Sequence, residues 1–201
     1  MKNILLTSTG LGNKAVFEKF LSIIPKKIGE LKLLFIPTAS RTEGEMLFVM
    51  KSLNELIKIG VQRDNIVWFN PDDISTHCDS TQVDGIYVCG GNTFYLLHKL
   101  KDSGFFSKIQ KLANEGLLYI GVSAGSVICA PDINYILCMD ANDIKLKETS
   151  ALSFVSSSII PHYTDELAND VRLLRESNCE VITISDSEAL SIQGEIIEKV
   201  G

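Results

Sequence analysis

Length, composition and charge place the chain among ordinary globular proteins. It has 201 residues, of which 45% are hydrophobic and 22% charged, with a formal net charge of −6 and a pI of about 5.1. This length suits one core, so we predict a single domain over residues 1–201. The acidic balance argues against nucleic acid or an anionic membrane as a partner, and no apolar run approaches the roughly 18 residues of a membrane span.

Cysteine usage points to a reducing compartment, and we expect a cytoplasmic protein. The five cysteines are odd in number and include no C-x-x-C pair, which indicates free thiols. The spacing of histidines and cysteines does not match a metal site. We therefore predict no metal.

Short apolar runs alternate with amphipathic stretches over the first 122 residues. The apolar runs predict strands at Ile4–Thr7, Leu33–Ile36, Ile66–Phe69, Gly85–Cys89 and Leu117–Val122. The amphipathic stretches predict helices at Asn13–Ile24, Glu43–Ile59, Thr93–Leu100 and Phe105–Glu115. Continuous apolar strands separated by helices indicate a parallel sheet covered on both faces. We predict an α/β three-layer sandwich with a mostly parallel sheet.

The pattern changes after Pro131. Short β-like pieces are expected at Tyr135–Met139, Ala151–Val155 and Ser157–Ile160, followed by a helix at Asp165–Glu176. Two further runs, Val181–Ser185 and Ala189–Gln193, resemble a terminal hairpin or paired strands.

A nucleophile elbow is predicted where the fifth strand ends. Gly121-Val122-Ser123-Ala124-Gly125 matches G-x-S-x-G, directly after an apolar strand and before Ser126–Ala130, which can form a helix. The nucleophile of such a turn has a strained backbone, and side chains two residues away on either side would collide. The following helix directs its free N–H groups at the same space. Ser123 is therefore the candidate nucleophile; the alternative is a tight turn without chemistry.

A glycine-rich loop is expected beside this elbow. Gly90-Gly91-Asn92-Thr93 follows the preceding parallel strand, and ligands bind beyond the carboxyl ends of such strands. The backbone N–H groups of Gly91 and Ala124 would together form an oxyanion hole. Asn92 would cap the next helix, hold the loop or contact a substrate. A plain glycine-rich turn is the alternative.

The general base is chosen by elimination among three histidines. His77 lies in a polar loop and His98 in the middle of a predicted helix, whereas His162 follows a strand that ends in Pro161. A serine nucleophile needs a base within hydrogen-bond reach. We take His162 as that base, with a structural histidine as the alternative.

Four segments together resemble peptidase family S51, whose members include aspartyl dipeptidases and cyanophycinases. The resemblance spans about residues 1–193 and is carried by Phe35-Ile36-Pro37-Thr38-Ala39-Ser40, Gly90-Gly91-Asn92-Thr93-Phe94-Tyr95-Leu96-Leu97, Gly121-Val122-Ser123-Ala124-Gly125-Ser126 and Pro161-His162-Tyr163. It implies a flavodoxin-like fold similar to the class I glutamine amidotransferases. It also implies hydrolysis of small peptides, with Ser123 as nucleophile and His162 as base, a reaction that needs no organic cofactor. The substrates of the family are peptides with an N-terminal aspartate, such as Asp-Xaa dipeptides, or the β-aspartyl-arginine units of cyanophycin.

The resemblance leaves two choices for the acid that orients the imidazole. Asp186 lies in Asp186-Ser187-Glu188-Ala189-Leu190, which is similar to a Glu-x-x-Ala-Leu pattern of the family, and it is our first choice. Asp140, between the serine and the histidine, is the alternative. Arg172 and Arg175 are candidates for binding a substrate carboxylate, because a guanidinium can pair with it through two hydrogen bonds. A solvated helix face is the other interpretation of these arginines.

Two rival functions remain open. One is an esterase of the α/β-hydrolase type, which shares G-x-S-x-G but normally carries its histidine late in the chain; here only 39 residues separate Ser123 from His162. The other is a non-catalytic flavodoxin-like binding module that keeps the turn without turnover. The peptidase interpretation predicts a monomer or homodimer with a small peptide as its partner.

Overall fold

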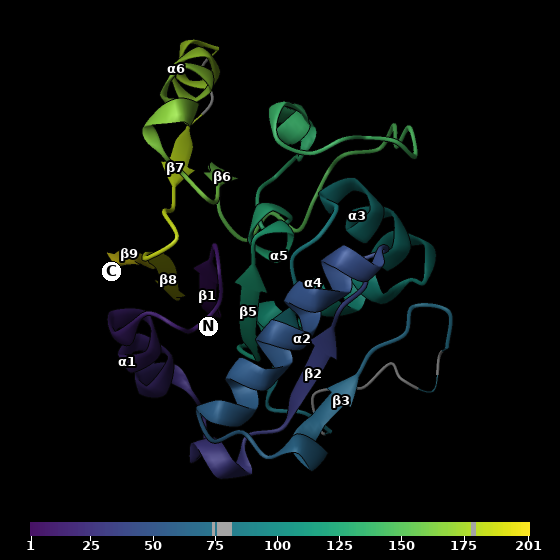
Figure 1. Cartoon of the computed structure of the whole chain (residues 1–201), viewed down its shortest axis with the longest axis vertical. Helices are drawn as coiled ribbons and strands as arrows, with labels where there is room; N and C mark the ends of the chain where they lie inside the picture. Colours follow the sequence, from purple (N-terminus) through teal and green to yellow (C-terminus); the bar gives the residue numbers. More distant parts are fainter. Residues whose placement is uncertain (74, 76–81, 178–179) are drawn as a thin grey trace.

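A seven-stranded sheet forms the centre of the computed structural model, which describes residues 1–73, 75, 82–177 and 180–201 (Figure 1). The strand order is β3-β2-β4-β5-β1-β8-β9. The first five strands in this order are parallel, while β8 is antiparallel to β1, and β9 to β8. The strands span Asn3–Thr7 (β1), Leu33–Ile36 (β2), Ile66–Trp68 (β3), Gly85–Val88 (β4), Leu118–Val122 (β5), Ala189–Gln193 (β8) and Ile196–Val200 (β9).

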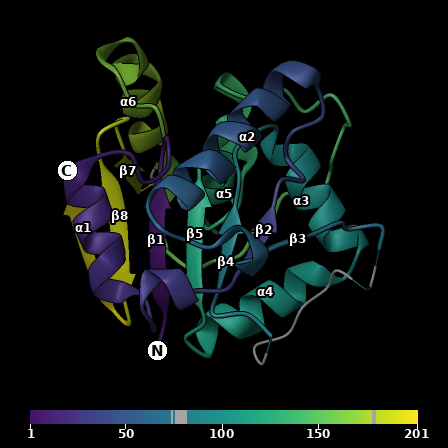
Figure 2. The same cartoon turned by 60° about the horizontal axis from the view of Figure 1, so that its bottom comes forward.

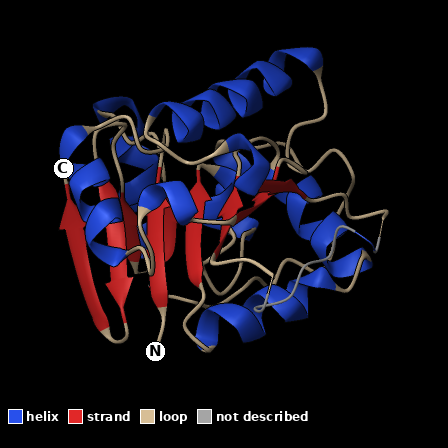
Figure 3. Ribbon diagram, turned by 90° about the horizontal axis from the view of Figure 1, so that it is seen from below, coloured by secondary structure: helices blue, strands red, loops and turns tan. Residues whose placement is uncertain are grey.

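Helices cover both faces of this sheet (Figures 2 and 3). On one face, α1 (Lys14–Ile23) and α2 (Glu43–Lys58) bury apolar side chains against alternate residues of the strands, such as Leu5 and Phe35. On the other face, α3 (Thr93–Asp102), α4 (Phe105–Asn114) and the short α5 (Ala124–Val127) pack on Ile4, Leu34 and their neighbours. Because the central strands are buried on both sides, their sequences are continuously apolar. The predicted three-layer α/β fold is confirmed.

The register of the parallel strands aligns their carboxyl ends. Thr7 lies beside Val122, and Val88 beside Gly121, so the chain leaves β1, β4 and β5 at the same edge. The residues that follow these three strands, Ser8, Cys89 and Ser123, therefore begin loops that are neighbours in space. This edge is where an open α/β sheet binds its ligands.

Two of the predicted short strands after Pro131 are wrong. Residues 134–138 form a 3-10 helix instead, in which only Ile136 is buried. Residues 151–155 form no strand, because their N–H groups bond to carbonyls at the end of α5 and just beyond it. Leu152 donates to Ile128, and Phe154 donates to Cys129. The segment therefore satisfies the unpaired carbonyls of a helix end rather than a strand ladder.

The predicted pairing of the last two apolar runs is also wrong. Val181–Thr183 (β7) pairs in parallel with Ser158–Ile160 (β6) in a separate two-stranded sheet, whereas β8 joins the central sheet and forms a hairpin with β9, which was not predicted. Helix α6 (Ala168–Glu176) connects β6 to β7 and lies at the outer end of the molecule (Figure 1). Among the described residues, no helix is long and apolar enough to cross a membrane.

Candidate active site

Ser123 occupies a sharp turn between β5 and α5. Its φ of 51° and ψ of −110° are rare for a residue with a side chain, and such conformations cost on the order of 1–3 kcal/mol. A Cβ on Gly121 would lie 2.5 Å from the Gly125 carbonyl oxygen, and one on Gly125 would lie 2.4 Å from the Val88 carbonyl oxygen. Since both obstacles are backbone atoms, neither can move aside, and the turn requires glycine at both positions.

Short hydrogen bonds connect this turn to β1 and β5. The Ser123 N–H donates to the Thr7 carbonyl at 2.9 Å. The Ser126 hydroxyl, which is fully buried, accepts from the Thr7 N–H at 3.0 Å and lies within donor range of the Thr7 and Gly121 carbonyls, at 2.8 and 2.9 Å. The Tyr119 hydroxyl donates to the Gly125 carbonyl at 2.7 Å. The nucleophile turn is thereby held rigidly within the central sheet.

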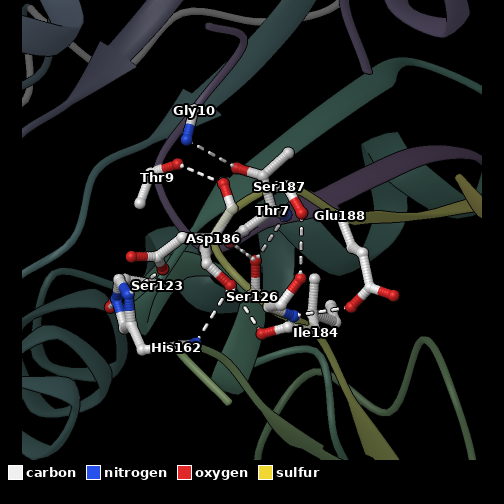
Figure 4. A network of polar contacts seen from close by, with 12 residues as sticks. Thr7, Thr9, Gly10, Ser123, Ser126, His162, Ile184, Asp186, Ser187 and Glu188 are labelled. Atoms are coloured by element: carbon white, nitrogen blue, oxygen red, sulfur yellow. Dashed lines mark hydrogen bonds and ion pairs between the residues drawn. The ribbon is translucent and has the colours of Figure 1, made fainter. Parts of the chain in front are cut away.

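His162 and Asp186 reach Ser123 from the two-stranded sheet. The His162 Nε2 lies 3.0 Å from the Ser123 Oγ, and its Nδ1 lies 2.7 Å from the Asp186 Oδ1 (Figure 4). A carboxylate can only accept, so Nδ1 carries the proton toward Asp186 and Nε2 is free to accept from the serine hydroxyl. The His162 and Asp186 side chains are 41% and 65% exposed, so the arrangement opens to solvent on this side.

The turn that carries Asp186 is fixed from two directions. The Thr9 hydroxyl donates to the Asp186 carbonyl at 2.9 Å, which ties the turn to the loop after β1. The Glu188 carboxylate accepts from the Ser185 N–H at 2.8 Å and pairs with Lys199 at 2.9 Å. Burial works to raise the pKa of Glu188, but the Ser185 hydrogen bonds and Lys199 outweigh it, so the pKa lies below its usual value. Glu188 is therefore a charged brace for this turn.

Two backbone amides lie near Ser123 with no acceptor of their own. Gly91 has a φ of +133°, and a Cβ there would lie 2.4 Å from the Ala39 carbonyl group, so the position requires glycine. The adjacent Gly90 packs on Ser123, because a Cβ at Gly90 would lie 3.1 Å from the Ser123 Cβ. In the part of the chain that the structure describes, neither the Gly91 nor the Ala124 N–H donates a hydrogen bond. Both are therefore available to an oxygen atom beside the serine.

Comparisons with known proteins identify the family of the chain. The model of "Peptidase family S51" matches residues 4–200. The chain belongs to peptidase family S51. It is 35% identical over 99% of its length to the "Uncharacterized peptidase Lmo0363" of Listeria monocytogenes, covering 98% of that protein, and 30% identical over its whole length to "Peptidase E" of Shewanella amazonensis, covering 88%.

A solved structure gives the same result for the fold. A crystal structure from Listeria monocytogenes EGD-e, presented as a candidate Peptidase E, superposes with a TM-score of 0.81 at 30% identity, covering 99% of this chain and 98% of the other. S51 is a family of serine peptidases, so the chain is a serine-type peptidase. The suggested resemblance to this family is confirmed.

In this S51 peptidase, Asp140 bonds to the glycine-rich loop rather than to His162. Its Oδ2 accepts from the Thr93 N–H at 2.5 Å, and its Oδ1 accepts from the Asn92 amide at 2.7 Å. The Asn92 side chain also donates to the Ala141 carbonyl and caps α3 by accepting from the Tyr95 N–H, both at 2.8 Å. Asn92 is 5% exposed and its amide is fully engaged, so it holds the loop. The structure thus brings Asp186, and not Asp140, to the imidazole.

The structure does not bring the two candidate arginines to Ser123. Arg172 pairs with Glu176 and donates to the Asn169 side chain at 2.9 Å, while Arg175 donates to the Val181 carbonyl at 3.4 Å. All of these contacts lie on α6 or the strand after it. Of the other histidines, His98 is exposed on α3, and His77 lies outside the described residues.

Sequence reasoning missed the polar residues that follow β1. Ser8 and Thr9 bond to the segments that carry His162 and Asp186. One signal was available: Thr7-Ser8-Thr9 is a polar run directly after an apolar strand. In a parallel sheet, such a run lies at the edge where the other loops of a site converge.

Proposed function

We propose that this S51 peptidase hydrolyses small peptides through a Ser123–His162–Asp186 triad and an acyl-enzyme intermediate. The observation that carries the proposal is the continuous chain of contacts, with 3.0 Å from Ser123 Oγ to His162 Nε2 and 2.7 Å from His162 Nδ1 to Asp186 Oδ1. A nucleophile, a base and an orienting acid in this geometry are the requirements for acyl transfer.

In the first half of the reaction, His162 Nε2 removes the proton from Ser123 Oγ while Oγ bonds to the scissile carbonyl carbon. The negative charge that develops on the carbonyl oxygen is stabilised by the N–H groups of Gly91 and Ala124, each worth about 3–4 kcal/mol in such a site. The carbon–nitrogen bond then breaks, and the imidazolium gives its proton to the departing amine.

In the second half of the reaction, a water molecule hydrolyses the acyl-enzyme. His162 accepts a proton from the water molecule as its oxygen attacks the acyl carbon. The bond to Ser123 Oγ breaks, and Oγ takes the proton back from the imidazolium. Asp186 keeps Nδ1 protonated and stabilises the imidazolium throughout. Solvent exposure of His162 and Asp186 gives this water a short path to the site.

Dipeptides with an N-terminal aspartate are the proposed substrates, on the basis of the family resemblance. The name Peptidase E is carried by relatives of this chain from Shewanella amazonensis and from Escherichia coli, of which one from Escherichia coli is 29% identical over 83% of this chain. A panel of Asp-Xaa, Glu-Xaa and Ala-Xaa dipeptides tests this specificity. Equal kcat/KM for all three classes would contradict the aspartate requirement without affecting the triad.

The nucleophile is tested separately with a fluorophosphonate probe, which reacts with an activated serine. We expect wild type to be labelled at Ser123 and Ser123→Ala to be unlabelled and without peptidase activity, with unchanged circular dichroism. Folded wild type that is not labelled would favour a non-catalytic module. Labelling together with turnover of p-nitrophenyl esters but of no dipeptide would favour an esterase.

A further inference from the structure

The two halves of the proposed triad belong to different sheets. Ser123 follows β5 of the seven-stranded sheet, whereas His162 follows β6 and Asp186 follows β7 of the two-stranded sheet. The distance from Nε2 to Oγ therefore depends on how firmly the smaller sheet is attached to the larger one. Apolar packing between α5 and β6 brings the sheets together, but it is not directional.

Ser8 makes a directional link between the two sheets. It is the first residue after β1 and is 1% exposed. Its hydroxyl donates to the Ile184 carbonyl at 2.8 Å and accepts from the His162 N–H at 3.0 Å. One buried hydroxyl thus bonds to the backbone of the base and to the strand end two residues before the acid.

The backbone of His162 explains why this link is needed. Its φ of 54° is left-handed, which is uncommon for a residue with a side chain. On either side of it, the two segments bond directly to each other: the Ile184 N–H donates to the Ile160 carbonyl and the Tyr163 N–H donates to the Ile184 carbonyl. The N–H of His162 leaves this pairing and points to Ser8. A buried N–H without an acceptor costs free energy, so the hydroxyl stabilises the conformation that directs the imidazole at Ser123.

The main sheet completes the connection from Ser8 to the nucleophile. Thr7, the residue before Ser8, accepts from the Ser123 N–H at 2.9 Å and bonds to Ser126 on both its N–H and its carbonyl. Figure 4 shows Thr7 and Ser126 in one polar network with Ser123, His162, Ile184 and Asp186. From Ser123 to Thr7, through Ser8 and on to His162, every step is a covalent bond or a short hydrogen bond.

We propose that Ser8 is a positioning residue for hydrolysis: its hydroxyl fixes the His162 backbone at the distance from Ser123 that proton transfer requires. The proposal rests on the proposed function. It predicts an effect on kcat rather than on KM, because Ser8 orients the base and is buried away from solvent. Misplacing a catalytic group by about 1 Å can lower a rate about 100-fold.

The test compares three single variants on an active dipeptide. Ser8→Ala should lower kcat by about 10- to 100-fold with KM changed by less than about threefold. Ser8→Cys keeps the size and a weak donor and acceptor, so it should retain more activity than Ser8→Ala. Ser191→Ala is the matched control: Ser191 is 1% exposed, lies on β8, and its hydroxyl has no partner among the described residues. Its kcat should equal that of wild type.

A double variant shows whether Ser8 acts through the imidazole. In a His162→Ala background, Ser8→Ala should cause no further loss of the residual activity, since there is no base left to position. An equal loss in both backgrounds would overturn the proposal, as would wild-type kcat in Ser8→Ala. If Ser8→Ala does not fold, Ser8→Cys decides the question in the same backgrounds.

Fluorophosphonate labelling distinguishes a failure of the Ser8 proposal from a failure of the proposed triad. Absence of fluorophosphonate labelling in wild type would contradict the triad itself. Labelling of wild type and Ser8→Ala at the same rate would leave the triad intact and contradict the role of Ser8. We expect Ser8→Ala to be labelled at the same site about 10- to 100-fold more slowly than wild type.

Discussion

Ser123 and its two proposed partners are held in place by different means. Ser123 is fixed by contacts inside the central sheet. Backbone atoms leave no room for a side chain at the two glycines of its turn, and hydrogen bonds join the turn to the neighbouring strand β1. His162 and Asp186 lie on segments that follow the two-stranded sheet, and hydrogen bonds of the Ser8 and Thr9 hydroxyls tie these segments to the loop after β1. The nucleophile region is buried, whereas the His162 and Asp186 side chains are 41% and 65% exposed.

This difference separates stability from catalysis. Substitutions of Gly121 or Gly125 in the nucleophile turn force buried backbone atoms apart, so their first effect is on the free energy of unfolding. Substitutions of Asp186, or of the side chains that hold the His162 and Asp186 segments, remove hydrogen bonds without forcing backbone atoms apart, so the fold survives and the rate of acyl transfer falls.

Among the residues that hold or orient the imidazole, the largest catalytic effect is expected for Asp186→Asn. An amide in place of the carboxylate would favour the wrong imidazole tautomer, and the loss of a triad acid lowers kcat about 10⁴-fold. Because the side chain is 65% exposed, the melting temperature should change by less than about 2 °C. Steady-state kinetics and thermal unfolding measure the two effects. A fall in kcat of less than tenfold would remove Asp186 from the proposed triad.

The nucleophile turn should show the reverse behaviour in Gly125→Ala. The added Cβ would lie 2.4 Å from the Val88 carbonyl oxygen, so we expect a loss of about 3 kcal/mol or more in the free energy of unfolding. Gly44→Ala is the control, since the nearest atom to its Cβ would be 4.0 Å away and alanine favours the helix. Urea denaturation of both variants measures the difference. Equal stabilities would mean that the turn relaxes around a side chain.

The Ser123 turn could be predicted from the sequence, whereas the placement of His162 and Asp186 beside it could not. The turn at Ser123 follows from local sterics: an apolar strand, two glycines at fixed spacing and a short helix lie within ten residues. The positions of His162 and Asp186 depend on pairing between β6 and β7, and 20 residues lie between the end of β6 at Ile160 and the start of β7 at Val181. The apolar runs at 181–185 and 189–193 have similar patterns, and nothing local indicates that they join different sheets.

The choice of the acid that orients His162 shows most clearly what could not be predicted from the sequence. Asp140 and Asp186 both follow short apolar segments, so the sequence left two choices. They differ only in what folding places opposite them: the Thr93 N–H and the Asn92 amide for Asp140, and the imidazole of His162 for Asp186. Ser8 escaped notice for the same reason, because its two partners are 154 and 176 residues away in the chain.

A smaller effect on stability and on kcat is expected for Asp140→Asn, which tests whether Asp140 supports the glycine-rich loop rather than the imidazole. The carboxylate accepts from the first N–H of α3 and from the Asn92 amide, so its loss should lower the free energy of unfolding by about 1 kcal/mol. The loop carries the Gly91 amide, and we expect kcat to fall less than about tenfold. Assayed beside Asp186→Asn, a loss of 10³-fold or more, on the order of that for a triad acid, would transfer the orienting role to Asp140.

The smallest effect on stability and activity is expected for Glu188→Gln, which tests how the Glu188 carboxylate supports the turn that carries Asp186. The hydrogen bonds from Ser185 and the charge of Lys199 lower the pKa of the Glu188 carboxyl in the folded protein, against the effect of burial. A lowered pKa contributes stability above the unfolded pKa of about 4.3, and this stability is lost as the pH falls through the folded pKa.

The glutamine variant should therefore be less stable than wild type by about 0.5–1 kcal/mol at pH 7, and the difference should shrink toward about pH 3. Urea denaturation across this range measures it, with Glu195→Gln at an exposed turn as the control for loss of one charge. Activity should change by less than about threefold, because Thr9 still holds the Asp186 carbonyl. A difference in stability that stays constant with pH would mean that the side chain braces the turn by its shape rather than by its charge.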